Sequence, residues 1–237
     1  MLKRLLLIAL LLAALPAAAQ PVPGRKPQPL PSVGLELVLL VDGSASITVG
    51  DLEFQLRGHA AAFADPEVAE ALAARGVAVT LAAFSGPKSL HVLVPWTVIA
   101  SPEDSQAFAG RILAAPREGR ADSTAIGSAI EEAARLFGTG GVRSERQVID
   151  LVANGFSNAG VDPAQARDRA AARGITINAL AILDEFPWLE EYFAENVIGG
   201  ANCFTKSALD RETFVAALRQ KLVLEVAALP YAESVLP

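Results

Sequence analysis

The sequence has 237 residues, 52% of them hydrophobic, and carries 26 Asp and Glu against 20 Lys and Arg, a formal net charge of −6. A negatively charged surface repels phosphate groups, and the sequence has no basic stripe interleaved with aromatic residues. Neither nucleic acid nor an anionic membrane is therefore expected as a partner. The single cysteine, Cys203, excludes an internal disulfide framework, so stability has to come from the core.

The N-terminal residues have the pattern of a secretory signal peptide. The basic pair Lys3-Arg4 precedes a short apolar run that ends in small residues. Residues 1–19 are therefore predicted to be removed on export, which places the mature protein in the periplasm or outside the cell. Residues 20–32 are rich in proline and polar residues and predict an extended linker. Residues 33–237 are long enough for one sizeable domain, with no membrane insertion expected.

Strand-like and helix-like patterns alternate along this predicted domain. Such alternation is typical of a doubly wound α/β fold, with a mainly parallel sheet and helices on both faces. The predicted strands are Leu35–Val41, Val77–Ser85, Val92–Ile99, Arg146–Val152, Ile175–Ile182 and a short one near Asn202–Thr205.

Caps and helical periodicity predict the helices between these strands. Asp-Pro or Ser-Pro pairs mark three helix starts, at Asp65-Pro66, Ser101-Pro102 and Asp162-Pro163. The helix whose core face holds Ile126 is expected to have Asp122 or Ser123 as its N-cap, and the last helix is expected from Arg211 to about Ala227.

In the first predicted helix, His59 recurs at helical spacing with Leu52, Leu56 and Phe63. These four side chains are expected to share one buried face. His59 is therefore predicted to be buried, uncharged and hydrogen-bonded.

Polar residues follow the first predicted strand at alternate positions. Asp42, Ser44 and Ser46 supply one carboxylate and two hydroxyls within five residues. They stand past the carboxyl end of a strand, where open α/β sheets place their ligand sites. Hard oxygen donors of this kind suit Mg²⁺ or another hard divalent cation, although an Asx-turn followed by a serine cap would also explain the triplet.

Two later loops also offer oxygen donors beside helix or strand ends. Thr124 lies in the segment ADSTAIG at the start of a predicted helix, and Asn154 begins the segment NGFSNAG after a predicted strand. A doubly wound sheet brings together the turns that follow its strands, so Thr124 and Asn154 are expected near Asp42.

With these three loops the sequence resembles a von Willebrand factor A-type (VWA) domain over roughly residues 35–226. Members of that family carry a metal-ion-dependent adhesion site (MIDAS) made of an Asp-x-Ser-x-Ser loop, a Thr in the second loop and an Asp in the third. The segments Pro187-Trp188-Leu189 and Asn196–Gly200, with Tyr192, resemble a bacterial family of secreted VWA-like proteins of uncharacterised function.

The resemblance implies a protein-binding module whose cation engages a Glu or Asp of a partner protein. The implied ligands are Asp42, Ser44, Ser46, Thr124 and Asn154, holding Mg²⁺ or alternatively Mn²⁺ or Ca²⁺. Asn154 stands where the family has Asp, and a single carboxylate leaves the site with a formal charge of +1. This predicts weak or absent cation binding, and the alternative function is a metal-free VWA-like scaffold with a decayed site.

A hydrolase is the more distant alternative. The segment around Ser157 approximates a nucleophile elbow after a strand. The only histidines, His59 and His91, precede Ser157, and the hydrolase order needs a histidine after the serine, so no enzymatic activity is expected. The sequence does not indicate a role for Cys203, and a buried thiol is the common case for a lone cysteine. It also gives no partner for Asp150, which lies in the middle of a predicted strand.

Overall fold

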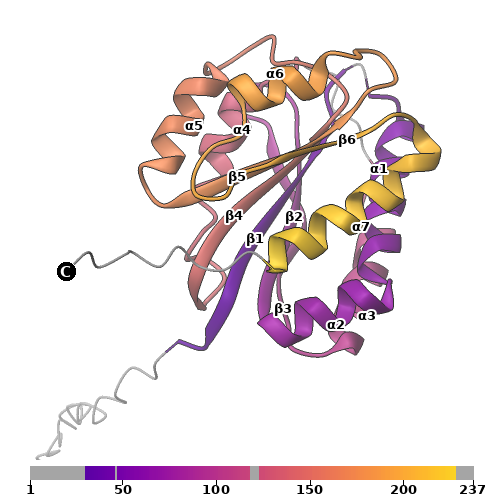
Figure 1. Ribbon diagram of the computed structural model, residues 1–237, viewed down its shortest axis with the longest axis vertical. Coiled ribbons are helices and arrows are strands. Elements are labelled where there is room, and N and C mark those ends of the chain that lie inside the picture. Colours follow the sequence, from indigo (N-terminus) through magenta and orange to yellow (C-terminus); the bar gives the residue numbers. More distant parts are fainter. Residues whose placement is uncertain (1–29, 46, 118–122, 228–237) are drawn as a thin grey trace, which may run out of the picture.

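A six-stranded sheet runs through the centre of the computed structural model, which describes residues 30–45, 47–117 and 123–227 (Figure 1). The strands lie in the order β3-β2-β1-β4-β5-β6, and only β3 runs antiparallel to its neighbour. Their bounds are β1 Ser32–Asp42, β2 Val77–Phe84, β3 Leu90–Ile99, β4 Arg143–Ala153, β5 Ile175–Ile182 and β6 Thr205–Ala208.

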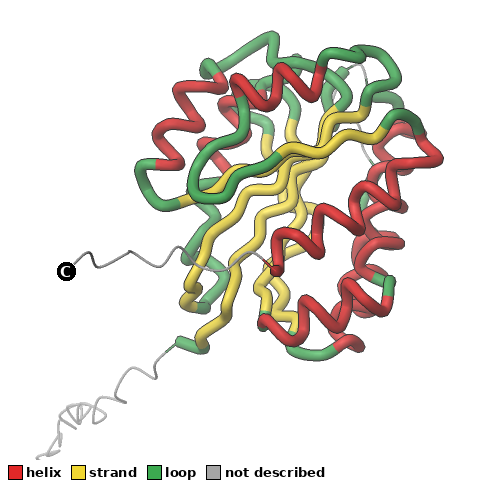
Figure 2. The backbone as a smooth tube through the Cα atoms, viewed as in Figure 1, coloured by secondary structure: helices red, strands yellow, loops and turns green. Residues whose placement is uncertain are grey.

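Helices cover both faces of the sheet, which confirms the predicted doubly wound α/β architecture (Figures 1 and 2). The helices α1, α2, α3 and α7 lie on one face, and α4, α5 and α6 lie on the other. In the described part of the chain, no helix has the length and apolar character needed to cross a membrane. The helices are α1 Val49–Phe63, α2 Pro66–Arg75, α3 Pro102–Ala114, α4 Ile126–Ala133, α5 Pro163–Ala171, α6 Leu189–Asn196 and α7 Arg211–Ala227.

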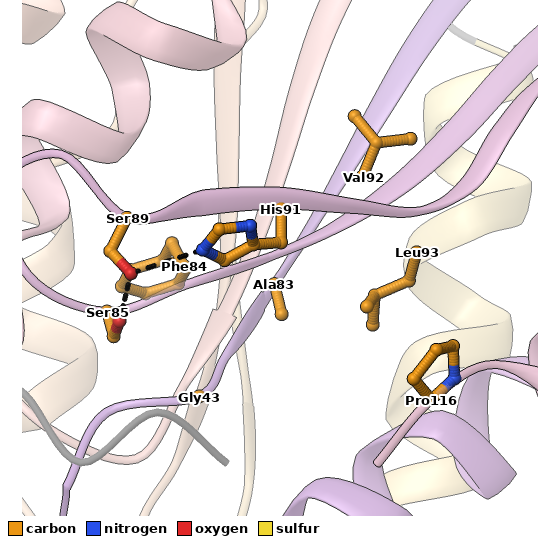
Figure 3. Close-up of a pocket in the computed structure, with 9 residues that line it drawn as sticks. All are labelled: Gly43, Ala83, Phe84, Ser85, Ser89, His91, Val92, Leu93 and Pro116. Carbon is orange, nitrogen blue, oxygen red and sulfur yellow. Dashed lines mark hydrogen bonds between the residues drawn. The ribbon is translucent and has the colours of Figure 1, made fainter. Parts of the chain in front are cut away.

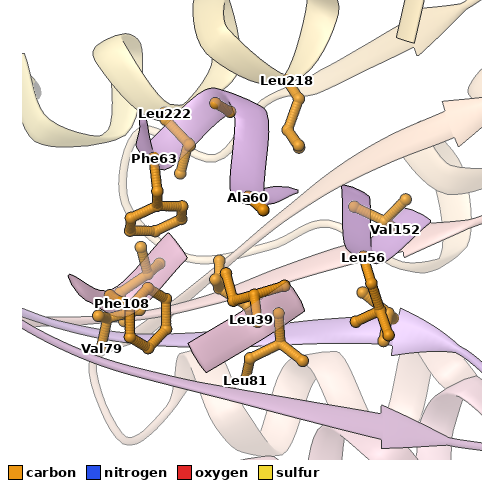
Figure 4. Close-up of a cluster of buried hydrophobic side chains, with 14 of the residues drawn as sticks. Leu39, Leu56, Ala60, Phe63, Val79, Leu81, Phe108, Val152, Leu218 and Leu222 are labelled. Carbon is orange, nitrogen blue, oxygen red and sulfur yellow. The ribbon is translucent and has the colours of Figure 1, made fainter. Parts of the chain in front are cut away.

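The central strand β1 is buried on both faces, as its continuous apolar sequence predicts. Alternate residues point to opposite layers, so Leu39 packs with Leu56 and Phe63 of α1 (Figure 4). Leu40 belongs to the apolar cluster on the other face, which includes residues of α4. Fully burying a leucine or phenylalanine contributes about 1.5–3 kcal/mol, which makes these two apolar layers the main source of stability.

Most predictions of helices and strands are confirmed, and the errors concern the last strand of the sheet, β6, and helix α6. The last strand, predicted near Asn202–Thr205, runs from Thr205 to Ala208, and helix α6 was not predicted. Cys203 is half-buried and has no disulfide partner. Residues 1–29 are not described, so the predicted signal peptide and most of the predicted linker lie outside the described part of the chain.

Asp150, Lys221 and Glu225 form a completely buried ionic cluster between β4 and α7. Lys221 Nζ pairs with both carboxyl groups, and Asn178 Nδ2 donates a hydrogen bond to Glu225 Oε1 over 3.1 Å. Burial and then the Asp150 charge raise the pKa of Glu225 to about 8. Burial opposes the charge on Lys221, but Asp150 and Glu225 outweigh it and raise its pKa.

His59 is fully buried, as predicted, and its Nδ1 lies 2.8 Å from the Gln55 carbonyl oxygen, which can only accept a hydrogen bond. Burial is the largest influence on this imidazole and lowers its pKa below the ordinary value. The stability gained from an uncharged His59 is therefore present above about pH 6.5 and lost as the pH falls below that value.

Compared with His59→Gln, the wild-type protein should lose up to about 1.4 kcal/mol of unfolding free energy per pH unit below about pH 6.5. Glutamine keeps an N–H donor for the Gln55 carbonyl but does not titrate. Urea denaturation of both proteins between pH 5 and 8 gives the difference directly, since other titrating groups contribute equally to the two curves. Parallel curves would contradict a buried, uncharged His59.

Candidate metal centre

The three predicted loops meet at the carboxyl edge of the sheet. β1 and β4 are parallel neighbours whose last residues are Asp42 and Ala153, so the first loop and the Asn154 loop begin side by side. The second loop is joined to the third by two hydrogen bonds of 2.9 Å. Thr124 N donates to Asn158 Oδ1, and Asn158 N donates to Thr124 O. The loops of Asp42, Thr124 and Asn154 are thus held at one edge.

The Asp42 carboxyl group is completely buried, and one of its two oxygens has no hydrogen-bond partner in the described part of the chain. Its backbone is fixed by Gln55, whose Oε1 accepts from Asp42 N over 3.2 Å and whose Nε2 donates to Asp42 O over 3.0 Å. Oδ1 accepts from Ser44 N over 2.8 Å, whereas Oδ2 has no hydrogen-bond partner in the described part of the chain. Burial raises the pKa of Asp42 to about 6, despite hydrogen bonds from Ser44 that lower it. An unpartnered, buried carboxylate oxygen fits a cation ligand.

Three of the four remaining predicted ligands are nearly buried oxygen donors. Ser44, Thr124 and Asn154 are all less than one-tenth exposed, and Ser46 lies outside the described residues. No group of three or more His, Cys, Asp or Glu suited to a metal occurs among the residues that the structure describes. The donor set is therefore one carboxylate with hydroxyl and amide oxygens, which suits Mg²⁺, Mn²⁺ or Ca²⁺ better than a soft metal.

Residues beyond the predicted set surround Asn154. It lines a small cavity together with Gln55, Phe54 and Arg211. The Arg211 guanidinium pairs with the carboxylate of Asp51 and lies 4.8 Å from the centre of the Phe54 ring. The pair with Asp51 neutralises a positive charge that would otherwise repel a cation beside Asn154. Periodicity gave no signal for Gln55 or Arg211, because their roles depend on contacts between distant segments.

Helix α4 starts without the predicted cap. Its N-cap is Ala125, which makes no side-chain hydrogen bond, so the cap expected at Ser123 is wrong, and the alternative Asp122 lies outside the described residues. Instead, Ser157 Oγ accepts from Ile126 N over 3.2 Å and donates to Thr124 O over 3.3 Å. A β-carbon on Gly127 would lie 2.1 Å from Val161 O, so only glycine permits this close approach of α4 to the third loop.

These contacts argue against Ser157 as a nucleophile. Its hydroxyl group joins the second and third loops, and neither histidine bonds to it. His59 belongs to α1, on the face of the sheet opposite α4. The hydrolase alternative therefore has no geometric support.

His91 lies at one end of a separate pocket of about 280 Å³ beside the first loop (Figure 3). Ser85 Oγ donates to Ser89 Oγ over 2.9 Å, and His91 Nε2 lies 3.4 Å from Ser89 Oγ. The opposite end is apolar, and Gly43 connects the pocket to the Asp42 loop. No carboxylate bonds to His91 in the described part of the chain, so this serine–histidine contact lacks the acid of a catalytic triad.

Residues 32–230 match a family model described as a protein of unknown function, DUF1194. Comparison with curated protein sequences gives no match.

Several solved structures, one of them a von Willebrand factor type A protein, share the fold at low sequence identity. A VWA protein from Catenulispora acidiphila is 17% identical, with a TM-score of 0.56, over 82% of this chain and 43% of that one. Proximal thread matrix protein 1 from the mussel byssus, solved with a zinc-occupied MIDAS motif, is 17% identical, with a TM-score of 0.57, over 84% of this chain and 49% of that one. BatB from Bacteroides thetaiotaomicron is 18% identical, with a TM-score of 0.50, over 82% and 99% of the two chains.

The chain thus spans a little under half the length of the first two of these structures. At these identities the matches establish a VWA-type fold for this chain.

Proposed function

The chain belongs to the DUF1194 family and has a VWA-type fold, and from this premise we propose that it is a protein-binding module that holds a divalent cation at the carboxyl edge of its sheet. The ligands that we assign to the cation are Asp42, Ser44, Ser46, Thr124 and Asn154. The unpartnered, buried Oδ2 of Asp42 carries this proposal, because a cation there would relieve the burial of a carboxylate.

The proposed partner is another protein that presents a Glu or Asp. Asp42 alone leaves a bound divalent cation with a formal charge of +1, and a partner carboxylate would supply the missing charge. A mussel byssus protein of the same fold is described with a zinc-occupied MIDAS motif, which supports cation binding at this edge of the fold. The oxygen-rich donor set here favours Mg²⁺, with Mn²⁺ or Ca²⁺ as substitutes.

We place this module outside the cytoplasm. The signal-peptide pattern of residues 1–19 supports export, and the proline-rich residues 20–32 would separate residues 33–237, the proposed VWA-like domain, from the cleavage site. A periplasmic or secreted location suits a module that binds other exported proteins.

Asn154→Asp should tighten Mg²⁺ binding about tenfold, equivalent to about 1.4 kcal/mol, because it adds a second carboxylate to the donor set. Titration calorimetry with Mg²⁺, Mn²⁺ and Ca²⁺ measures the change. Asp42→Ala should abolish the binding heat, whereas Gln165→Glu, which adds the same charge at an exposed position of α5, should leave it unchanged.

The same samples test the partner chemistry. A short peptide with a single Glu should bind the Mg²⁺-loaded protein and be released by a chelator, and its Gln counterpart should not bind. If neither the wild type nor Asn154→Asp binds any divalent cation at millimolar concentrations, the metal-free scaffold replaces this proposal.

A further inference from the structure

Four aromatic side chains form a partly exposed aromatic patch next to the candidate metal centre: Phe156, Phe186, Trp188 and Tyr192. Phe156 comes from the loop after β4, and the other three come from the segment between β5 and the middle of α6. The ring of Phe156 lies 5.5 Å from those of both Phe186 and Trp188, and Phe186 and Trp188 lie 5.3 Å apart. Phe156 is two residues from Asn154, so the patch adjoins the metal loops.

The patch is held in place by the core beneath it. Ser157 N donates to the Tyr192 hydroxyl oxygen over 3.3 Å, which joins the third loop to α6. Leu189 and Phe193 of α6 are completely buried and attach that helix to the sheet. The rings are therefore positioned before any ligand arrives, which reduces the entropy lost on binding.

Two rings of the patch face solvent. Trp188 is 47% exposed and Phe156 is 39% exposed, and they are the only aromatic residues among the exposed large hydrophobic side chains of the described residues. A contiguous exposed apolar surface of this kind marks an interaction site more often than scattered exposed residues do. Tryptophan and tyrosine are also the residues most enriched at binding hot spots.

Unpaired carboxylates accompany the patch. Residues 174–205, which supply three of the four rings, contain no Lys or Arg and five acidic residues. None of the five takes part in an ion pair within the described part of the chain. The five are Asp184, Glu185, Glu190, Glu191 and Glu195. Glu185 and Glu191 are next to Phe186 and Tyr192 in the chain and are both exposed, so a ligand that lies on the rings would approach a negatively charged segment.

We propose that the aromatic patch binds an arginine side chain of a partner protein. A guanidinium group stacks on aromatic faces and pairs with carboxylates, so it matches both features at once. The chain itself contains such a pair, since Arg211 lies over Phe54 and pairs with Asp51. Anionic lipid headgroups would be repelled by the carboxylates, which makes a membrane a poorer occupant.

This inference goes beyond the metal centre and does not require it. If both the metal centre and the aromatic patch bind the same partner, that partner presents an acidic residue to the cation and an arginine to the rings. Each contact can be measured without the other.

The test uses the blocked peptide Gly-Arg-Gly-Arg-Gly and a matched peptide with citrulline in place of arginine, in buffer with chelator. NMR of the two indole N–H signals reports binding. Trp188 should shift saturably, whereas Trp96, whose indole donates to Thr139 Oγ1 over 3.0 Å, should not and serves as the internal reference. The citrulline peptide should bind at least about tenfold more weakly, because it lacks the charge.

Variants locate the contact. Trp188→Ala should weaken peptide binding about tenfold, read from the Phe156 amide signal, and Glu185→Gln with Glu191→Gln should weaken it and reduce its salt dependence. Asp42→Ala should bind the peptide as the wild type does, so a failed metal site and a failed patch give different results. Equal binding of the citrulline peptide, an unmoved Trp188 signal, or retention of binding in a folded Trp188→Ala protein would overturn the proposal. Preferential binding to phosphatidylcholine vesicles would also overturn it.

Discussion

Lys221→Met should lower the free energy of unfolding at pH 7 by about 3–5 kcal/mol. The substitution keeps the length and apolar stem of the side chain but leaves the Asp150 carboxylate buried without its cation. Glu225, whose pKa is raised by its burial and by the Asp150 charge, has no positive charge to replace that of Lys221. Urea denaturation followed by circular dichroism measures the loss.

The double variant Lys221→Met with Asp150→Leu provides the control. Removing both charges also removes the unpaired carboxylate, so most of the lost stability should return. A loss below about 1 kcal/mol in the single variant would mean that water reaches the pair, since exposed ion pairs contribute no more than that. Comparing the single and double variants thus separates the cost of an unpaired Asp150 carboxylate from the cost of the lost apolar contacts.

The buried ionic cluster also shows the limit of prediction from this sequence. Asp150 stands out as an acid in an apolar strand, but its partner lies 71 residues later in α7. Lys221 shares the buried face of that helix with Phe214 and Leu218, but the sequence analysis did not predict a buried lysine there. Pairing the two residues requires knowing that α7 packs over β4, which is a property of the tertiary structure.

Local patterns predicted the strands because each is a short apolar run with a clear end. The bounds of β5 are those predicted, and β1 and β4 are longer than predicted by only a few residues at either end. Helix α6 was not predicted because its eight residues follow an exposed loop and its N-cap residue, Trp188, makes no side-chain cap hydrogen bond. The start of α4 depends on Ser157, about 30 residues away, so no local cap signal exists for it.

The candidate metal centre could also be predicted only in part. Its oxygen donors follow strand ends or, for Thr124, precede a helix, and they were predicted from the alternating Asp42, Ser44 and Ser46 and from the two later loops. The contacts that set its charge and rigidity come from α1 and α7, through Gln55 and Arg211, and have no sequence signature. The unpartnered oxygen of Asp42 is likewise visible only once the surrounding hydrogen bonds are known.

That oxygen makes Asp42 a residue whose removal should stabilise the metal-free protein. In the fold its pKa is about 6, against 3.8 for an ordinary aspartate, so between these values the folded state binds more protons than the unfolded state. The fold therefore loses stability as the pH rises from about 4 to 6, and above pH 7 the full penalty amounts to about 3 kcal/mol.

Asp42→Asn should consequently raise the melting temperature at pH 7.5 in chelator, by several degrees if about half of that penalty is recovered. The recovery is incomplete because the new amide group places a donor without a partner where Oδ2 now lies. Added Mg²⁺ should reverse the order, since it stabilises only the wild type, in proportion to RT ln(1 + [Mg²⁺]/Kd). Thermal unfolding of both proteins, with and without Mg²⁺, shows whether the order of the two melting temperatures reverses. At pH 4 the wild type carries little of the ionisation penalty, so the variant, which keeps its unpartnered amide donor, should be the less stable protein. A variant less stable than the wild type in chelator would show that ionised Asp42 is already compensated within the fold, which removes the physical reason for a cation at this edge.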